Sequence, residues 1–206
     1  MNIKLSAFAA LLATAFAAHA QTPAPAAAPP AAPVAGAIEQ RDVNQQNRIE
    51  QGLKSGQLTT REAAQLERQT GQVDRMQANA LKDGSLSKAE AARISRAQAR
   101  VSKDIYAQKH DAQHGNPESA SSERMQAAVQ RDANQAARIQ QGVQSGSLTN
   151  RETAALNRGQ ARDLTQQARA GHDGNLSAAE ARRAQKRENV QSKRIYNKKH
   201  NARVRG

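Results

Sequence analysis

Histidine is the side chain of this sequence best suited to acid–base chemistry near neutral pH, and the chain contains five of them. Nucleophilic catalysis needs such a base beside a hydroxyl or thiol, yet cysteine is absent and no Gly-x-Ser-x-Gly or phosphate-loop motif occurs. His110 and His114 are four residues apart, so they could share a helix face as metal ligands, with Asp111 nearby. Two imidazoles do not complete a site. The sequence predicts a protein that is not an enzyme and holds no cofactor or metal. If a metal is bound, His110 and His114 are the candidate ligands.

A second pattern that could bind a metal is Asp83-Gly84-x-Leu86-Ser87-x-x-Glu90, which recurs with variations from Ser55, Ser145 and Asp173. It resembles the second half of an EF-hand loop, with its sharp glycine turn and closing glutamate. The first half departs from that loop, because Asn79 and Leu81 stand where calcium requires charged oxygens. The same residues suit a helix stop, with glycine in the left-handed conformation, followed by a capping box of Ser/Thr and Glu. We therefore expect four helix boundaries here.

These boundaries predict an all-α fold of two tandem three-helix units. An offset of 90 aligns residues 41–114 with 131–204 without a gap, and 35 of 74 positions are identical. We expect helices over 39–54, 60–82 and 88–111, and over the same ranges plus 90. The second copy has fewer large apolar residues, since Gln166, Gly171 and Ala184 replace Met76, Leu81 and Ile94. It is predicted to be the looser half, and either unit alone should be marginally stable unless dimerisation or a partner completes it.

The chain begins with an export signal. Residues 1–20 contain an apolar stretch followed by Ala18-His19-Ala20, which predicts signal-peptide cleavage before Gln21. Residues 21–37 hold five of the six prolines and predict a disordered Pro/Ala-rich spacer. Helical repeat 1 is expected over 38–111, a linker over 112–123 and helical repeat 2 over 124–206. This organisation predicts a periplasmic or secreted protein with no transmembrane segment after cleavage.

The motifs Leu-Thr-x-x-Glu-Ala-Ala-x-Leu, from Leu58, and Ile-Tyr-x-x-Lys-His, from Ile105 and again from Ile195, carry a wider resemblance. The pattern is similar to a family of uncharacterised exported Gram-negative helical-repeat proteins, and the similarity covers both repeats. It implies export and a helical fold, and it implies no activity.

The net charge of +13 indicates anionic partners, and the excess of basic over acidic residues is largest in the C-terminal repeat. Residues 41–113 carry 13 Lys/Arg against 9 Asp/Glu, whereas 131–206 carry 16 against 6. The candidate anion-binding residues all belong to the last predicted helix: Arg182, Arg183, Lys186, Arg187, Lys193, Arg194, Lys198 and Lys199. We expect an envelope-associated interaction protein whose C-terminal helix binds an anionic surface or a polyanion. The alternatives are a Ca²⁺- or Zn²⁺-responsive module and extracellular nucleic-acid binding, which the scarcity of stacking aromatics disfavours; a homo-oligomer is also possible.

Overall fold

The computed structural model describes residues 31–203, with side chains from Val34 onward, and every regular element in that range is a helix. The helices are α1 (Ala31–Lys54), α2 (Thr60–Ala80), α3 (Lys88–Lys109), α4 (Ala120–Gln144), α5 (Asn150–Ala170) and α6 (Ala178–Lys199). The prediction of an all-α protein built from two three-helix units is therefore confirmed. The predicted signal peptide over 1–20 and the first ten residues of the predicted spacer lie outside the described residues.

The four predicted capping boxes are all present. At the start of α3, the Glu90 backbone N–H donates to Ser87 Oγ over 3.2 Å, and the Ser87 backbone N–H donates to Glu90 Oε2 over 3.0 Å. The same reciprocal pair caps α2, α5 and α6 at Thr59, Thr149 and Ser177. The glycines before these caps are left-handed, with φ of +73° at Gly56 and +95° at Gly84. Local hydrogen bonding therefore sets these helix starts.

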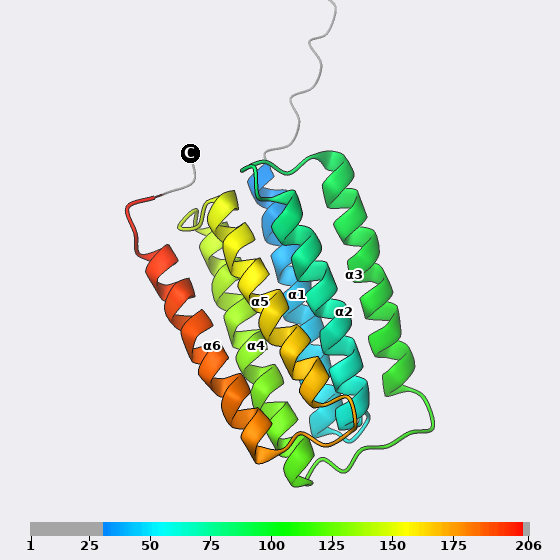
Figure 1. The fold of residues 1–206 in the computed structure, drawn as a ribbon. Coiled ribbons are helices and arrows are strands. Elements are labelled where there is room, and N and C mark those ends of the chain that lie inside the picture. Colours follow the sequence, from blue (N-terminus) through cyan, green and yellow to red (C-terminus); the bar gives the residue numbers. More distant parts are fainter. Residues whose placement is uncertain (1–30, 204–206) are drawn as a thin grey trace, which may run out of the picture.

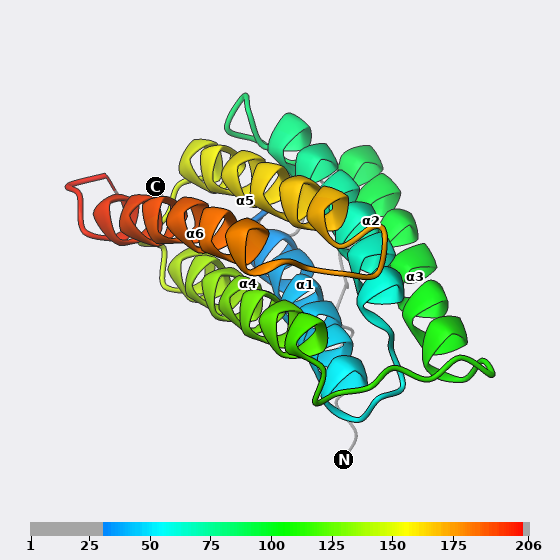
Figure 2. The same ribbon diagram turned by 60° about the horizontal axis from the view of Figure 1, so that its bottom comes forward.

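The two repeats pack against each other along their whole length. Helix α1 runs antiparallel to α4 and α2 runs antiparallel to α5, and these two pairings are the most extensive in the fold (Figure 1). Helix α3 covers α1 and α2 on one flank, and α6 covers α4 and α5 on the other (Figure 2). The result is a central four-helix layer with one further helix on each side.

The hydrophobic core is shared between the repeats. Met125, Val129 and Leu176 of repeat 2 belong to the cluster built mainly from repeat 1. In return, Ala35 from the first turns of α1 packs into the cluster around Ile139. The largest fully buried side chains come equally from both copies: Ile49, Leu53, Leu58, Leu66, Ile94, Ile105, Met125, Ile139, Leu148, Leu156, Leu164 and Leu176. Each repeat thus supplies the packing surface that the other one lacks.

Two helices begin well before their predicted starts, and the helix ends predicted at 82, 111, 172 and 201 each fall two residues earlier in the structure. Helix α1 begins at Ala31, inside the predicted spacer over 21–37. Proline is tolerated in the first turn of a helix, where its missing N–H has no intrahelical partner, and the buried Ala35 and Ile38 then anchor this turn. Helix α4 begins at Ala120, inside the predicted linker over 112–123, because the Ser119 hydroxyl caps it by accepting from the Ser122 N–H over 3.2 Å.

The glycine that seemed to weaken repeat 2 has a packing role. Gly171 is buried, and a Cβ there would lie 2.4 Å from the Met125 methyl group. Met125 itself is fully buried. The loss of Leu81 at this aligned position therefore makes room for a large residue from α4, and it leaves no gap.

Candidate anion-binding surface

The eight basic residues predicted on the last helix divide into two sets. Five of them are exposed on the outer side of α6: Arg182, Arg183, Lys186, Lys193 and Arg194. The other three, Arg187, Lys198 and Lys199, are half-buried. Arg187 Nε lies 3.9 Å from Asp163 Oδ1, and Lys199 Nζ donates to Gln141 Oε1 over 2.8 Å. The opposite side of α6 is anchored by the buried Ala184, Glu188, Gln191 and Ile195. The predicted anion-binding helix thus presents five free-standing cations to solvent.

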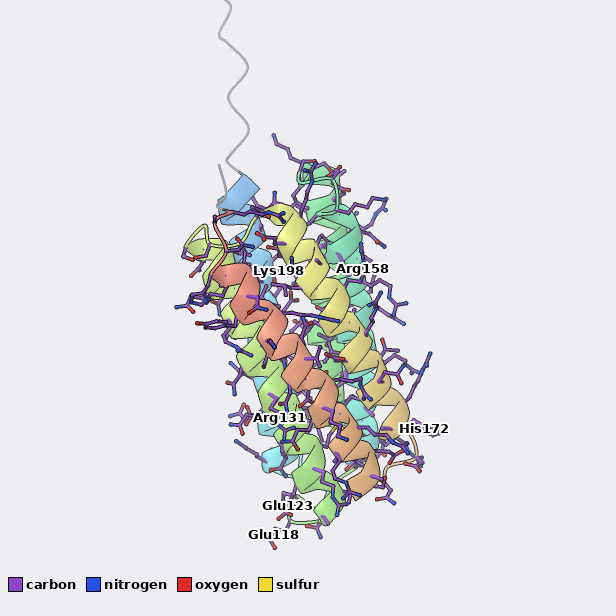
Figure 3. All side chains as sticks on the ribbon, turned by 60° about the vertical axis from the view of Figure 1, so that its left-hand side comes forward. Glu118, Glu123, Arg131, Arg158, His172 and Lys198 are labelled. Carbon is purple, nitrogen blue, oxygen red and sulfur yellow. The ribbon has the colours of Figure 1, made fainter. Side chains whose placement is uncertain are left out.

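Figure 3 looks onto this flank of the molecule, with α6 in front of α4 and α5. The labelled Lys198 on α6 and Arg158 on α5 lie toward one end of the view. Glu118 and Glu123, at the start of α4, lie at the opposite end. Positive charge therefore continues from α6 onto α5, while the exposed acids of this side gather at the base of the bundle.

A larger basic surface follows the line along which α2 and α5 meet. Along α2 the cations are spaced by seven residues, which keeps them on one side of a helix. We call the following exposed set the α2–α5 basic face: Arg61, Arg68, Arg75, Lys82, Arg151, Arg158, Arg162 and Arg169. In the part of the chain that the structure describes, the ion pairs are Lys54 with Glu50, Arg131 with Glu188 and Arg187 with Asp163. None of them neutralises a residue of this face.

The carboxylates of the same two helices point the other way. On α2, Glu62, Glu67 and Asp74 are all buried, whereas every arginine of that helix is exposed. On α5, Glu152 is buried and Asp163 is half-buried. The acids and bases of these helices are thus separated between the inside and the outside of the bundle.

The buried acids form a hydrogen-bonded centre that connects the two repeats. Asp42 accepts hydrogen bonds from Gln77 Nε2 and Gln98 Nε2, both over 2.6 Å. Asn157 of repeat 2 donates to Gln77 Oε1 and to Glu39 Oε1, both over 2.8 Å. The cavity at this centre measures only about 10 Å³, about enough for one water molecule. These residues therefore organise the core, and the cavity has no room for a larger ligand.

Burial shifts the protonation of these acids. Removal from water raises the pKa of Asp42 and of Glu67 to about 7, against the lowering effect of their amide hydrogen bonds. It raises the pKa of Asp74 and Asp132 well above the usual range, and nearby carboxylates add to the effect. Near neutral pH these groups carry less negative charge than a formal count assigns. The protein is therefore more positive than +13 in weak acid.

The EF-hand-like loops use their carboxylates for local hydrogen bonds. Asp83 Oδ1 accepts from the Ser85 backbone N–H over 2.9 Å, and Glu90 Oε2 accepts from the Ser87 hydroxyl over 2.6 Å. These hydrogen bonds lower the pKa of both carboxyls. Within residues 31–203, no group of three or more His, Asp or Glu side chains is arranged to hold a metal ion. The EF-hand-like loops of the described residues therefore bring together no set of ligands for a calcium ion.

The histidine candidates lie apart from the basic surface. His110 ends α3, where its ring stacks on Tyr106 with centroids 4.1 Å apart and its Nδ1 lies 2.7 Å from the Tyr106 carbonyl oxygen. Tyr196 and His200 repeat this arrangement at the end of α6. His114 is exposed in the following loop. His110 thus closes α3, with its ring against the carbonyl oxygen of the last helical turn.

The outward side of α1 and α4 is different in character. Its exposed side chains are mostly uncharged amides: Gln40, Asn44, Asn47, Gln51, Gln130, Asn134, Gln141 and Gln144. We call this set the α1–α4 amide face, and it lies on the far side of the bundle from α2 and α5 (Figure 2). The molecule is therefore basic on one broad face and nearly neutral on the other.

Comparison with protein-family models, with curated proteins and with solved structures finds no match to this chain. The resemblance to exported helical-repeat proteins thus stays a prediction. Across residues 31–203, no helix is long and apolar enough to cross a membrane.

The sequence analysis identified the basic residues of α6 and missed those of the α2–α5 basic face. One signal was available, since Arg61, Arg68, Arg75 and Lys82 follow a seven-residue spacing. The acids Glu67 and Asp74 stand next to Arg68 and Arg75 in the sequence, which therefore shows no excess of charge here. Only the tertiary packing shows that Glu67 and Asp74 are buried while the arginines of α2 are exposed.

Proposed function

We propose that this protein is a non-enzymatic, exported module that binds an anionic partner of the cell envelope through the exposed bases of α6. The observation that carries the proposal is the distribution of charge on α6, where five bases are exposed to solvent while Glu188 is buried. An anionic surface beside such a face gains about 1 kcal/mol per Lys or Arg close to it. The periplasm or the extracellular side of the envelope is the proposed location.

The surface of α6 favours peripheral attachment. The exposed large apolar residues in the described range are Tyr106, Val190 and Tyr196, and only the last two belong to α6. Insertion into a bilayer would need a broad apolar face, which α6 does not have. Binding is therefore electrostatic and should weaken as salt increases.

The test is cosedimentation of the chain from Gln21 to Gly206 with vesicles of anionic or neutral lipid over a salt series. A variant neutralises the five exposed α6 cations by substitution to Gln: Arg182, Arg183, Lys186, Lys193 and Arg194. Helix α3 offers a control of equal charge loss in five exposed cations, again changed to Gln: Lys88, Arg93, Arg96, Arg100 and Lys103. We expect binding to anionic vesicles only, lost in the α6 variant and largely kept in the α3 control. Equal losses in both variants would mean that overall charge, and not α6, attracts the membrane.

A further inference from the structure

A groove of about 590 Å³ lies along the α2–α5 basic face, where the middle of α2 meets the last turns of α5. Arg68 and Arg75 line it from repeat 1, and Arg169 and His172 line it from repeat 2. No residue that lines it carries a carboxylate. The groove therefore exists only because the two repeats pack together, and it is positive throughout.

Small residues line this groove and leave it unfilled. Ala64 and Ala168 line it with single methyl groups, and Thr165 adds a hydroxyl whose Oγ1 lies 3.5 Å from Arg75 Nη2. The two helices approach closely beside it, because a Cβ on Gly71 would lie 3.2 Å from the Ala161 carbonyl oxygen. Long cationic side chains thus stand on the rims of a shallow channel.

The spacing of the cations defines the shape of a ligand. Arg68 and Arg75 are seven residues apart, which corresponds to about 10.5 Å along a helix. Arg61 and Lys82 continue the same spacing at the two ends of α2. A compact anion such as one phosphate could meet one or two of these cations, whereas an extended chain could meet all of them.

The chemistry of the groove also limits the ligand class. The exposed Tyr and Val side chains of the described residues belong to α3 and α6, so His172 is the one aromatic ring among the lining residues of this groove. Single-stranded nucleic acid is normally held by stacking on aromatic side chains as well as by charge. Arginine, by contrast, suits phosphate groups because its planar fork donates two hydrogen bonds at once.

We propose that the groove between α2 and α5 is a binding site for an extended phosphate-bearing chain that lies along the seam between the repeats. Its phosphates meet Arg169, Arg68 and Arg75 in that order along the groove, and Thr165 and His172 lie within the same channel. This site is separate from the proposed membrane-binding surface of α6 and does not depend on it. Occupation would also relieve the mutual repulsion of the unpaired cations and would stabilise the contact between the repeats.

The experiment measures binding of inorganic polyphosphate to the chain from Gln21 to Gly206 by calorimetry at several salt concentrations. Orthophosphate at equal total phosphate is the length control. The test variant is R68Q/R75Q/R169Q, and the control of equal charge loss is K88Q/R96Q/K103Q on α3. All six positions are exposed, so both variants should fold, and circular dichroism checks this.

We expect long polyphosphate to bind and orthophosphate to show no saturable binding. The groove variant should lose at least about tenfold in affinity for polyphosphate. Its slope of log affinity against log salt should fall by about 2, since each phosphate contact contributes roughly 0.7. The α3 control should keep most of the affinity. Equal losses in the two variants would overturn the proposal, because binding would then follow net charge alone.

Two further measurements separate the ligand classes. The groove variant should bind anionic vesicles like the wild type, so a failure of this proposal is distinguishable from a failure of the α6 proposal. Oligo-dT at equal phosphate should bind more weakly than polyphosphate. Tighter binding of oligo-dT, lost in the groove variant, would replace the proposed ligand with single-stranded nucleic acid.

Discussion

Repeat 1 and repeat 2 make the same contacts at the two ends of the bundle. At one end, Arg61 Nη2 donates to the Asp173 carbonyl oxygen over 3.0 Å. At the other end, the aligned Arg151 Nη2 donates to the Asp83 carbonyl oxygen, also over 3.0 Å. Each capping turn thus docks on the first turn of a helix in the other repeat, and the pairing is reciprocal.

The repeats diverge where they face each other at the centre. Position 75 is arginine and the aligned position 165 is threonine, and these two side chains are neighbours across the seam. Asp74 and the aligned Leu164 line the same central cavity. Identical copies would bring two arginines together across the seam, and they would add a carboxylate to a cavity that Glu39, Asp42 and Asp74 already line. Two packed copies can therefore share their local turns, but they have to differ near their common axis.

The largest expected effect comes from making the centre symmetric. Leu164→Asp would add a further carboxylate to the small central cavity that Glu39, Asp42 and Asp74 already line, so we expect a loss of about 4 kcal/mol or more of unfolding free energy. Leu164→Ala is the control that measures the loss of the leucine side chain without an added charge. We expect it to lower the unfolding free energy by about 2–5 kcal/mol. The exchange D74L/L164D returns the cavity to its original number of carboxylates and should recover at least half of the L164D loss in urea unfolding. A double variant no more stable than L164D would show that like charge is not the reason for the divergence.

The second prediction concerns pH and the buried acids of repeat 1. The folded pKa of Glu67 and Asp42 is about 7, above the value of about 4 expected in the unfolded chain. The folded state then holds protons that the unfolded chain has released, so stability is greatest below about pH 4 and is lost as pH rises through about 7. We expect the melting temperature to fall between pH 4.5 and 8 at constant ionic strength, by about 2–4 °C per 1 kcal/mol lost.

Glu67→Gln tests the origin of this slope, because repeat 2 already has an amide, Asn157, at the aligned position. The variant should melt higher than the wild type at pH 8 and should show a flatter dependence on pH. The exposed Glu118→Gln is the control and should leave the slope unchanged. A wild type that becomes more stable as pH rises would contradict the assignment of buried, protonated acids.

A smaller effect on stability is expected from exchanging a large and a small side chain at one end of the core. Repeat 1 has Ala35 and Leu81 at the positions where repeat 2 has Met125 and Gly171. Gly171→Leu forces a side chain into the space of Met125 and should cost about 1–3 kcal/mol. Adding Met125→Ala restores the combination of repeat 1 and should recover most of that cost in chemical denaturation. If M125A makes G171L worse, the two positions do not compensate for each other.

The smallest effect, and the one expected to be equal in both repeats, comes from the caps. Ser87→Ala and Ser177→Ala each remove one capping hydroxyl and should each cost about 1 kcal/mol. The caps are local and far apart in sequence, so the two losses should add to within about 0.5 kcal/mol in the double variant. A cost confined to one repeat would show that the caps also serve the contact between the repeats.

The sequence by itself determined the features that depend on neighbouring residues. The four capping boxes, the left-handed glycines and the duplication were all predicted, because each involves hydrogen bonds within a few residues or direct self-alignment. Leu66 and Val73 on α2, and Ile94 and Ile105 on α3, recur at helical spacing in the sequence and are buried in the structure. Short-range chemistry was therefore sufficient for the helices and their order.

Only the tertiary structure decided which polar residues are inside. Asp74 and Arg75 are adjacent in sequence, yet the first is buried at the centre and the second stands on the rim of the groove. Whether each side chain is buried or exposed depends on the packing of α2 against α5. The aligned residues of these two helices are 90 positions apart in the sequence. Burial is a property of such long-range contacts, which local spacing does not encode. The separation of buried acids from exposed bases, and with it the α2–α5 basic face, appears only when the two repeats are folded together.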